Sequence, residues 1–389
     1  MAPRRPISLL KGKDHIAETW ADEPSRFADH HVDPFILWCV KKNSSDITIQ
    51  TDRPVYNEIY GTLYPGTFRP VDAADMNVFL NKIYGPDATA RLAGANDLDL
   101  SYEIRPDRYT RVRFRVNVTG ILSRGRDSAQ ITMRVLPNEP PTMTDLNVEE
   151  DIIRSWHPRQ GMVIITGPTG SGKTTLLAAG IRMLLERKRG CGKVVCYESP
   201  IEYVYDAIKS PRSLISQTEI PRHLPDFARG VRNALRRKPN IILVGEARDK
   251  ETISAAIEAS QTGHTVYTTT HTTGVASTIQ RMVATFDPNE RSERAYALME
   301  TVRLVVTQSL VPRVGGGRIG VREWMRFSDE VRDKFLAMDF YEWPAEIQRM
   351  IQFYGQTMAT SAGIIFDKGL IDRRTYIMLS SSTGGGGGD

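Results

Sequence analysis

The residues that most constrain this fold are Gly-Pro-Thr-Gly-Ser-Gly-Lys-Thr at 167–174. They satisfy the pattern G-x-x-x-x-G-K-[ST], they follow the apolar run GMVIITG, and a helical pattern begins at Lys173. Glycines let backbone N–H groups close around phosphate oxygens, and the helix that follows adds the positive end of its dipole. The pattern therefore predicts a phosphate-binding loop between a buried strand and a helix of an α/β domain.

The side chains of this loop predict nucleotide and metal contacts. Lys173 can reach the β- and γ-phosphates of a nucleotide, and the Thr174 hydroxyl can ligate Mg²⁺. We expect the nucleotide to contact the whole loop and the first turn of the helix, which comprise Gly167, Pro168, Thr169, Gly170, Ser171, Gly172, Lys173, Thr174 and Thr175.

Acidic residues follow two further strands of this region. Glu246 ends the apolar run IILVGE, which resembles a Walker B strand, so its carboxylate is expected to hold Mg²⁺ or the water around it. Glu198 and Glu202 lie in YESPIE, after the strand KVVCY. Ligands in open α/β sheets bind at the carboxyl ends of strands, where such a carboxylate can orient or deprotonate an attacking water. A solvated turn rich in acids and proline is the alternative.

Two histidines, His264 and His271, flank the strand TVYTTT and lie seven positions apart. A zinc pair is not expected, because no Cys or carboxylate lies at ligand spacing. A sensor of the γ-phosphate is one interpretation, and a capping or buried histidine is the other.

Composition narrows the class of protein further. The chain has 389 residues, 40% hydrophobic, with a net charge of +5, which excludes a mainly disordered chain and permits a nucleic-acid contact without requiring one. No apolar run approaches the roughly 20 residues of a membrane span. The low count of three cysteines and the absence of a visible secretory signal favour a reducing cytosol. The length predicts about two to three domains.

The pattern along the chain predicts a small α+β domain followed by a larger α/β domain. The first contains a helix in PFILWCVKK, a strand in DITIQ, a helix over 72–84 that opens on Asp72, and three strands between 98 and 137. PNEPPTMTD, at 137–145, is the predicted linker, because prolines disfavour helix and strand alike. Strands and helices then alternate, with one helix from Lys173 to Arg189, and the pattern is helical from 328 to 380.

Taken in order, the four elements resemble the Walker A, Asp box, Walker B and His box of the PilT/GspE-type secretion and pilus ATPases. GEARDKETISAAIEASQTGHTVYTTTHT carries most of this resemblance, which covers about 33–380. ESPIEYVY and HTTGVASTIQRMVATF are most similar to the DotB-like ATPases of type IVB (Dot/Icm) secretion and plasmid transfer. The Asp box has Ser199 where the pilus pattern has Asp, and no clear copy of the pilus-retraction signature follows.

The resemblance implies a RecA-like P-loop NTPase domain at 149–383, with C-terminal helices, preceded by a PAS-like domain at 33–136. An arm at 1–32, a linker and hinge at 137–148 and a Gly-rich tail at 384–389 complete the chain. The nucleotide would lie between the two domains. By the family motifs, Glu202 would be the catalytic carboxylate and Glu246 the Walker B acid. The remaining residues that the resemblance places in catalysis are Lys173, Glu198, His264, His271, Arg113, Arg124 and Arg134.

The implied function is that of a cytosolic homohexamer that hydrolyses ATP, with Mg²⁺, to power type IVB secretion or conjugative transfer. It would be recruited to the cytoplasmic side of an inner-membrane secretion complex, with no span of its own and no direct nucleic-acid contact. The alternatives are a type IV pilus extension or retraction motor, a DNA-stimulated translocase, and a scaffold that binds nucleotide without hydrolysing it.

Overall fold

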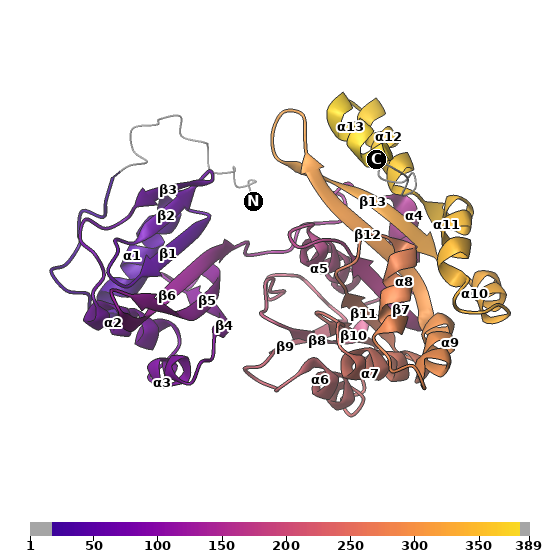
Figure 1. Cartoon of the computed structure of the whole chain (residues 1–389), viewed down its shortest axis with the longest axis horizontal. Helices are drawn as coiled ribbons and strands as arrows, with labels where there is room; N and C mark the ends of the chain where they lie inside the picture. The colour runs from indigo at the N-terminus through magenta and orange to yellow at the C-terminus, as the bar shows by residue number, and fades with distance from the viewer. Residues whose placement is uncertain (1–17, 382–389) are drawn as a thin grey trace. The chain divides into compact units, whose positions relative to one another are not determined.

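The computed structural model describes residues 18–381. The chain divides between Asn138 and Glu139 into two compact units, unit 1 and unit 2 (Figure 1). The predicted Gly-rich tail, and the predicted arm up to residue 17, lie outside the described residues. No helix within 18–381 is both long enough and apolar enough to cross a lipid bilayer.

Unit 1, within the described residues, consists of a six-stranded antiparallel sheet and three helices. The strands are ordered β3-β2-β1-β6-β5-β4. The elements are α1 (Asp29–Lys41), β1 (Asp46–Gln50), β2 (Tyr56–Ile59), β3 (Thr62–Pro65), α2 (Ala73–Ile83), α3 (Ala88–Ala93), β4 (Leu98–Ile104), β5 (Val112–Ser123) and β6 (Arg126–Leu136).

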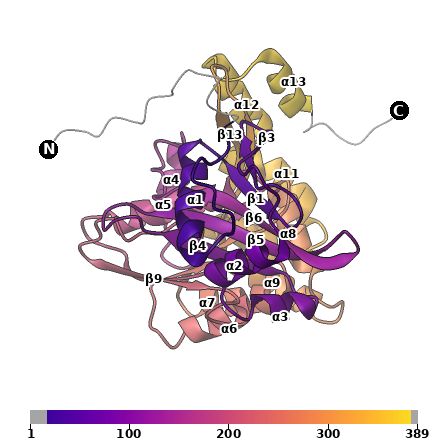
Figure 2. The same ribbon diagram turned by 90° about the vertical axis from the view of Figure 1, so that its left-hand side faces the viewer.

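Helices α1 and α2 pack on the sheet of unit 1, and the apolar side chains between them form its core (Figure 2). Phe35 of α1, Phe79 of α2 and Ile47 of β1 are fully buried there. The predicted Asp72 cap is confirmed, because its carboxylate accepts the backbone N–H of Asp75 at 2.8 Å. Such a cap satisfies one of the unpaired donors in the first turn of a helix.

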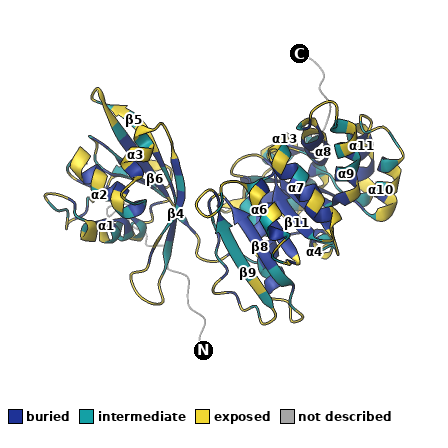
Figure 3. Ribbon diagram, turned by 90° about the horizontal axis from the view of Figure 1, so that it is seen from below, coloured by how far each residue is buried: buried dark blue, intermediate teal, exposed yellow. Residues whose placement is uncertain are grey.

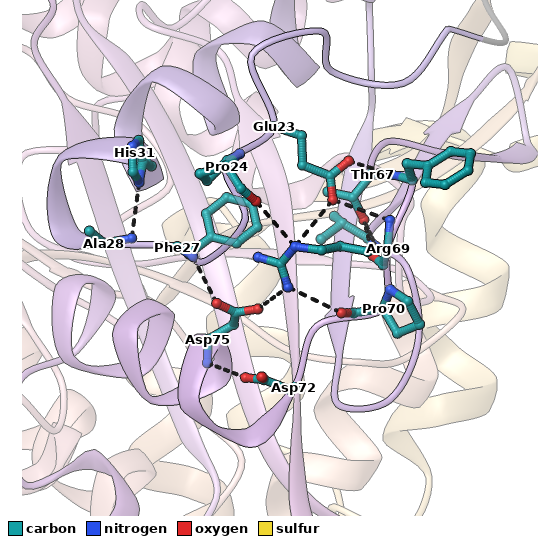
Figure 4. A network of polar contacts seen from close by, with 12 residues as sticks. Glu23, Pro24, Phe27, Ala28, His31, Thr67, Arg69, Pro70, Asp72 and Asp75 are labelled. Atoms are coloured by element: carbon teal, nitrogen blue, oxygen red, sulfur yellow. Dashed lines mark hydrogen bonds and ion pairs between the residues drawn. The ribbon is translucent and has the colours of Figure 1, made fainter.

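The segment before α1 is fixed to unit 1 by a polar network around Asp75 (Figure 4). Asp75 is 1% exposed, and it accepts Arg69 Nη1 at 2.5 Å and the backbone N–H of Phe27 at 2.8 Å. The rings of Trp20 and Phe27 are buried in the core of the unit. The structured part of unit 1 therefore begins before Asp33, where the sequence pattern placed its start.

Unit 2 is built around an eight-stranded sheet. Its elements are α4 (Glu150–Ser155), β7 (Gly161–Thr166), α5 (Lys173–Leu185), β8 (Gly192–Glu198), β9 (Ser213–Glu219), α6 (Phe227–Ala234), β10 (Ile241–Val244), α7 (Lys250–Gln261), β11 (Thr265–Thr269), α8 (Val275–Ala284), α9 (Arg291–Thr301), β12 (Val302–Pro312), β13 (Arg318–Arg326), α10 (Asp329–Leu336), α11 (Trp343–Tyr354), β14 (Gly355–Gln356), α12 (Met358–Asp367) and α13 (Arg373–Ser381).

The order of this sheet is β14-β13-β12-β7-β11-β10-β8-β9. The strands from β12 to β9 are parallel, and β13 and β14 are antiparallel to their neighbours. The side chains of α4 and α5 pack on one face, and those of α6 to α11 pack on the other. Figure 3 shows β11 in the dark blue of buried residues and the edge strand β9 mainly in the teal of intermediate ones. Strands β7 and β10 are buried along their whole length, which explains why they are nearly continuous apolar runs. Strand β11 is equally buried, although three of its five residues are threonines.

Several elements of unit 2 differ from the sequence prediction. The helix expected from Lys173 to Arg189 ends at Leu185, because Leu185 is its last buried residue and exposed charged residues follow. Strand β9 was not predicted, since SLISQTE has no apolar run and lies at the edge of the sheet. Helices α8 and α9 were also not predicted. The helical pattern expected over 328–380 is confirmed as α10 to α13, interrupted by β14.

The three cysteines, Cys39 in unit 1 and Cys191 and Cys196 in unit 2, are buried free thiols. Burial raises the pKa of all three, because the surroundings disfavour the charged thiolate. They pack as small apolar groups in the cores of the two units.

Close packing also explains a glycine inside α5. The ring of Trp156 is fully buried and lies against Gly180, where a Cβ atom would be 2.1 Å from two ring carbons. The Tyr267 hydroxyl donates to the Trp156 carbonyl oxygen at 2.6 Å, which restricts movement of the backbone at Trp156. The contact between α5 and Trp156 therefore leaves no room for a side chain at Gly180.

We predict that Gly180→Ala destabilises unit 2 by about 1–3 kcal/mol, the usual range for overpacking a core. This outweighs the gain of about 1 kcal/mol that alanine brings to a helix interior. Urea unfolding of the purified chain measures the difference. Gly363→Ala in α12 is the matched control, because its Cβ meets nothing nearer than a Tyr376 carbon at 3.9 Å. Equal midpoints for the two variants would contradict the prediction.

Candidate nucleotide site

The predicted phosphate-binding loop connects the end of β7 to the start of α5. Gly167 and Gly172 have φ angles of 144° and 81°, which side chains rarely adopt. A Cβ at Gly167 would lie 2.2 Å from the carbonyl oxygen of Gln308, and one at Gly172 would lie 3.0 Å from its Nε2 atom. Glycine is thus required at both positions, by the backbone conformation and by the contact with β12.

Lys173 begins α5, and its side chain folds back over the loop. Its Nζ atom donates to the carbonyl oxygens of Gly167 and Pro168 at 2.8 and 3.0 Å, and lies 3.4 Å from Nδ1 of His271. Only 8% of Lys173 is exposed. The loop therefore holds a nearly buried ammonium group against its own carbonyls, ready to exchange them for phosphate oxygens.

His271 and Glu246 extend the chain of contacts that begins at Lys173. His271 follows β11 and Glu246 follows β10, and Nε2 of the first is 3.3 Å from Oε1 of the second. An ammonium group can only donate, so Nδ1 of His271 is the acceptor in its contact with Lys173. These contacts bring together residues that follow β7, β10 and β11.

Glu198 is the last residue of β8 and Glu202 lies in the loop after it, and the two have different surroundings. Burial lowers the pKa of the Lys173 ammonium, and the negative charges of Glu246 and Glu202 oppose this shift. Glu202 is half-buried in the loop that follows β8. Glu198 is 7% exposed and accepts a hydrogen bond from Gln217 of β9 at 2.8 Å. The charge of Glu202 therefore acts on Lys173, whereas Glu198 is hydrogen-bonded to the neighbouring edge strand β9.

His264 lies at the other end of β11 from the phosphate-binding loop. Its Nδ1 atom is 3.1 Å from the carbonyl oxygen of Ala259 and 3.2 Å from the hydroxyl of Thr262, both at the end of α7. The five residues of β11 and Thr270 lie between it and His271, and β11 alone spans roughly 17 Å at the usual rise of a strand. Within this chain, His264 is therefore not brought together with Lys173, His271 and Glu246, and it contacts the last turn of α7.

The three predicted arginines all lie in unit 1. Arg113 is 3% exposed and lies 3.8 Å from the Glu103 carboxylate. Arg124, in the turn between β5 and β6, and Arg134 of β6 are exposed, and the latter is paired with Asp46 at 2.8 Å.

The loop suits a nucleotide and Mg²⁺. The Ser171 hydroxyl oxygen is buried and has no hydrogen-bond partner within residues 18–381, so it offers a polar group to a ligand. Helix α5 is long enough for its N-terminus to favour an anion. Mg²⁺ prefers oxygen ligands and keeps few from protein, so Thr174 and Glu246 are the residues that would hold it.

Sequence reasoning missed several residues that contact the predicted ones. The Tyr203 hydroxyl is 3.0 Å from that of Thr175, and Arg281 of α8 lines a cavity of about 220 Å³ beside Glu246 and His271. Tyr203 lies in ESPIEYVY and Arg281 in HTTGVASTIQRMVATF, but neither sequence assigns them a role, and only the folded chain brings them to the loop. Gln308 could have been noticed in the sequence, because it is a polar residue within a largely apolar strand. The structure shows that it is buried.

Fold and site together define a RecA-like P-loop nucleotide-binding domain preceded by a small α+β domain. The chain belongs to the family described as Type II/IV secretion system protein, which its residues 96–330 match.

Three relatives make this likeness more specific. The X-ray structure of the Legionella pneumophila ATPase DotB is 46% identical, has a TM-score of 0.88 and covers 93% of this chain and 98% of its own. The crystal structure of the pilus retraction motor PilT with bound ADP is 28% identical and has a TM-score of 0.77. The match covers 90% of this chain and 96% of the PilT chain. The type IV pilus retraction ATPase PilT of Pseudomonas aeruginosa is 31% identical over 338 residues, 87% of this chain and 94% of that one. The predicted fold class and the DotB-like resemblance are confirmed.

We predict that ADP stabilises the wild-type chain and fails to stabilise Lys173→Ala. At a ligand concentration of 100 times Kd the stabilisation is about 2.7 kcal/mol, and it vanishes when the loop loses its cation. Thermal unfolding with and without ADP and Mg²⁺ measures it. Lys188→Ala, an exposed lysine just after α5, is the control that should respond like wild type. An equal shift in Lys173→Ala would contradict the placement of the site.

Proposed function

We propose that this protein is a homohexameric, Mg²⁺-dependent ATPase that hydrolyses ATP to ADP and phosphate and so powers type IVB secretion or conjugative transfer. The observation that carries the proposal is the line of contacts from Lys173 through His271 to Glu246. It places a cation, an imidazole and a carboxylate at the carboxyl edge of a parallel sheet, beside a phosphate-binding loop. Open α/β sheets bind their ligands at this edge.

In this proposal, the loop residues bind and orient the triphosphate. The backbone N–H groups of 169–172 and the N-terminus of α5 surround the phosphates, and Lys173 exchanges its two loop carbonyls for phosphate oxygens. Mg²⁺ bound at Thr174 and Glu246 would neutralise charge on the β- and γ-phosphates. His271 contacts Lys173 and lies 3.3 Å from Glu246, so a γ-phosphate that arrives between them would change its partners, and His271 can report on the presence of that phosphate.

Glu202 is the proposed catalytic carboxylate. It lies in the loop after β8, half-buried, and its charge acts on the Lys173 ammonium. A carboxylate in that position can hold a water for in-line attack and accept its proton. Glu198 suits this role less well, because it accepts a hydrogen bond from Gln217 within the sheet.

Arg124 and Arg134 are the proposed source of positive charge for the transition state. Both are exposed on unit 1, and Arg113 of the same unit lies 3.8 Å from the Glu103 carboxylate. Guanidinium groups stabilise the charge on a transferring phosphoryl group, by about 10³–10⁵ in rate where such fingers are known. The proposal allows the arginines to act within one chain or across a subunit boundary of the ring.

Sequence identity favours type IVB secretion over a pilus motor. The chain is 46% identical to a DotB ATPase but 31% and 28% identical to the PilT proteins. We further propose that the ring is cytoplasmic and docks on an inner-membrane secretion complex. The neighbouring genes distinguish the two machines: genes for secretion-channel subunits support this proposal, and pilin genes would replace it with a pilus motor.

We predict that Glu202→Gln lowers kcat for ATP hydrolysis by about 10²–10⁴-fold, the size of a general-base contribution, and leaves ADP affinity unchanged. Phosphate release by purified protein and binding of a fluorescent ADP analogue measure the two. Asp206→Asn, an exposed acid of the same loop, is the matched control. If Glu198→Gln abolishes turnover and Glu202→Gln does not, the catalytic carboxylate is Glu198. If wild type binds ADP but shows no turnover, the chain is a nucleotide-binding scaffold.

We also predict that the double variant Arg124→Ala/Arg134→Ala lowers kcat by about 10³-fold or more in a ring of unchanged mass, six times 43.7 kDa by light scattering. Arg126→Ala, exposed at the start of β6, is the control. Mixing the double variant with Lys173→Ala restores turnover only if the arginines act across subunits. Full activity of the double variant would remove these arginines from the mechanism.

A further inference from the structure

A buried polar chain leads from the phosphate-binding loop to the residues of unit 2 at the end of the predicted linker. Gln308 of β12 and Arg322 of β13 lie directly opposite each other in the antiparallel pair, and both are almost fully buried. Nε2 of Gln308 donates to the carbonyl oxygen of Ser171 in the loop at 2.7 Å. Its Oε1 atom accepts Nε of Arg322 at 2.8 Å. One glutamine side chain therefore joins the loop to a buried guanidinium group.

The other side of the Arg322 guanidinium holds the segment 146–149. Nη1 donates to the carbonyl oxygen of Asn147 at 3.1 Å and to the Glu149 carboxylate at 3.0 Å, and Nη2 donates to the carbonyl oxygen of Leu146 at 2.9 Å. Burial lowers the pKa of Arg322, and the adjacent Glu149 opposes this shift. Four hydrogen bonds in a fixed fork geometry leave Arg322 little freedom to rotate.

The side chains of Gln308 and Arg322 are closely packed against the backbone of β13. A Cβ at Gly320 would lie 2.8 Å from Nη2 of Arg322 and 3.2 Å from Oε1 of Gln308, so this glycine makes room for the contact. Buried polar networks that are fully partnered are rigid, and the loss of one partner is transmitted to the next. A movement of the phosphate-binding loop therefore changes the hydrogen bonds of the segment 146–149, and the reverse also holds.

The contact at Ser171 fixes the direction of a phosphate-binding donor. A trans peptide is planar, so the Ser171 carbonyl and the N–H of Gly172 point in opposite directions. Gln308 holds the carbonyl on the β12 side, and so the N–H of Gly172 faces away from β12. Backbone N–H groups of such loops are the donors to phosphate oxygens. The orientation of this donor depends on Gln308 and, through it, on Arg322.

We propose that Gln308 and Arg322 are positioning residues that preset the phosphate-binding loop and couple its nucleotide state to the segment 146–149. This inference rests on the proposed nucleotide site. Coupling between two sites is reciprocal, so the conformation of 146–149 also sets the affinity of the loop for nucleotide. Because this segment lies at the end of the predicted linker, the pair gives the loop a direct route to the predicted hinge.

Hydrogen exchange in full-length protein tests the coupling without requiring hydrolysis. The backbone N–H groups of Leu146, Asn147 and Val148 are hydrogen-bonded, to oxygens of Thr142, Thr144 and Met143, so their exchange reports on local opening. In wild type, saturating ADP should slow exchange both in the loop and at 146–148. In Gln308→Met, which keeps the side-chain length but removes both polar contacts, slowing should persist in the loop and disappear at 146–148. The Kd for ADP should rise about tenfold.

Two more variants complete the test. Thr307→Val, the preceding residue of β12, changes a buried hydroxyl that has no hydrogen-bond partner within 18–381, and it should behave like wild type. Arg322→Lys keeps the charge but loses the fork, and should uncouple 146–148 if Gln308→Met does not fold. Slowing at 146–148 in all soluble variants would overturn the inference. Absence of slowing in the wild-type loop would instead overturn the proposed nucleotide site.

Discussion

The parallel pairing of β7 with β11 on one side and β12 on the other is the constraint on which the rest of unit 2 depends. In this register Ile165 lies beside Thr269, and Thr166 lies beside Thr307. Parallel strands end at the same edge of a sheet, so the loop after β7 meets the histidine after β11 and the glutamine in β12. An antiparallel β11 would have put His264 at this edge. A slip by one residue would have turned Gln308 to the other face.

The electrostatics of the loop follow from the same geometry. Lys173 is nearly buried, and burial lowers its pKa, yet Glu246 and Glu202 oppose that shift. Without a ligand, the ammonium group satisfies itself on loop carbonyls. A polyanion that enters the loop adds negative charge where a cation is poorly solvated, and such interactions are stronger than in water. The site therefore favours a ligand that brings its own charge, and a metal ion that offsets the excess.

The parts of this structure that sequence predicted are those with a local signature. The loop at 167–174, the acid at Glu246 and the cap at Asp72 depend on neighbours in the chain, and motif or periodicity was sufficient to find them. Strand β9 lacked a pattern because it lies at an edge, where few side chains need to be apolar. Trp20 was missed because a single aromatic residue has no period. Which of His264 and His271 lies near the phosphate-binding loop depends on the direction of β11. The alternation of strands and helices already indicated a parallel strand, which places His271 at the loop. The Gln308–Arg322 pair needed the register of two strands, which no motif encodes.

The buried thiols have a practical consequence for work on this molecule. Since each native cysteine is enclosed and its thiol pKa is raised, reagents that attack thiolates in the folded protein find few targets among them. A cysteine placed at Val314, which is 55% exposed in the turn between β12 and β13, would be modified selectively in an otherwise unaltered chain. A fluorophore attached there would lie at the end of the same two strands that carry Gln308 and Arg322, and would provide an optical signal from them.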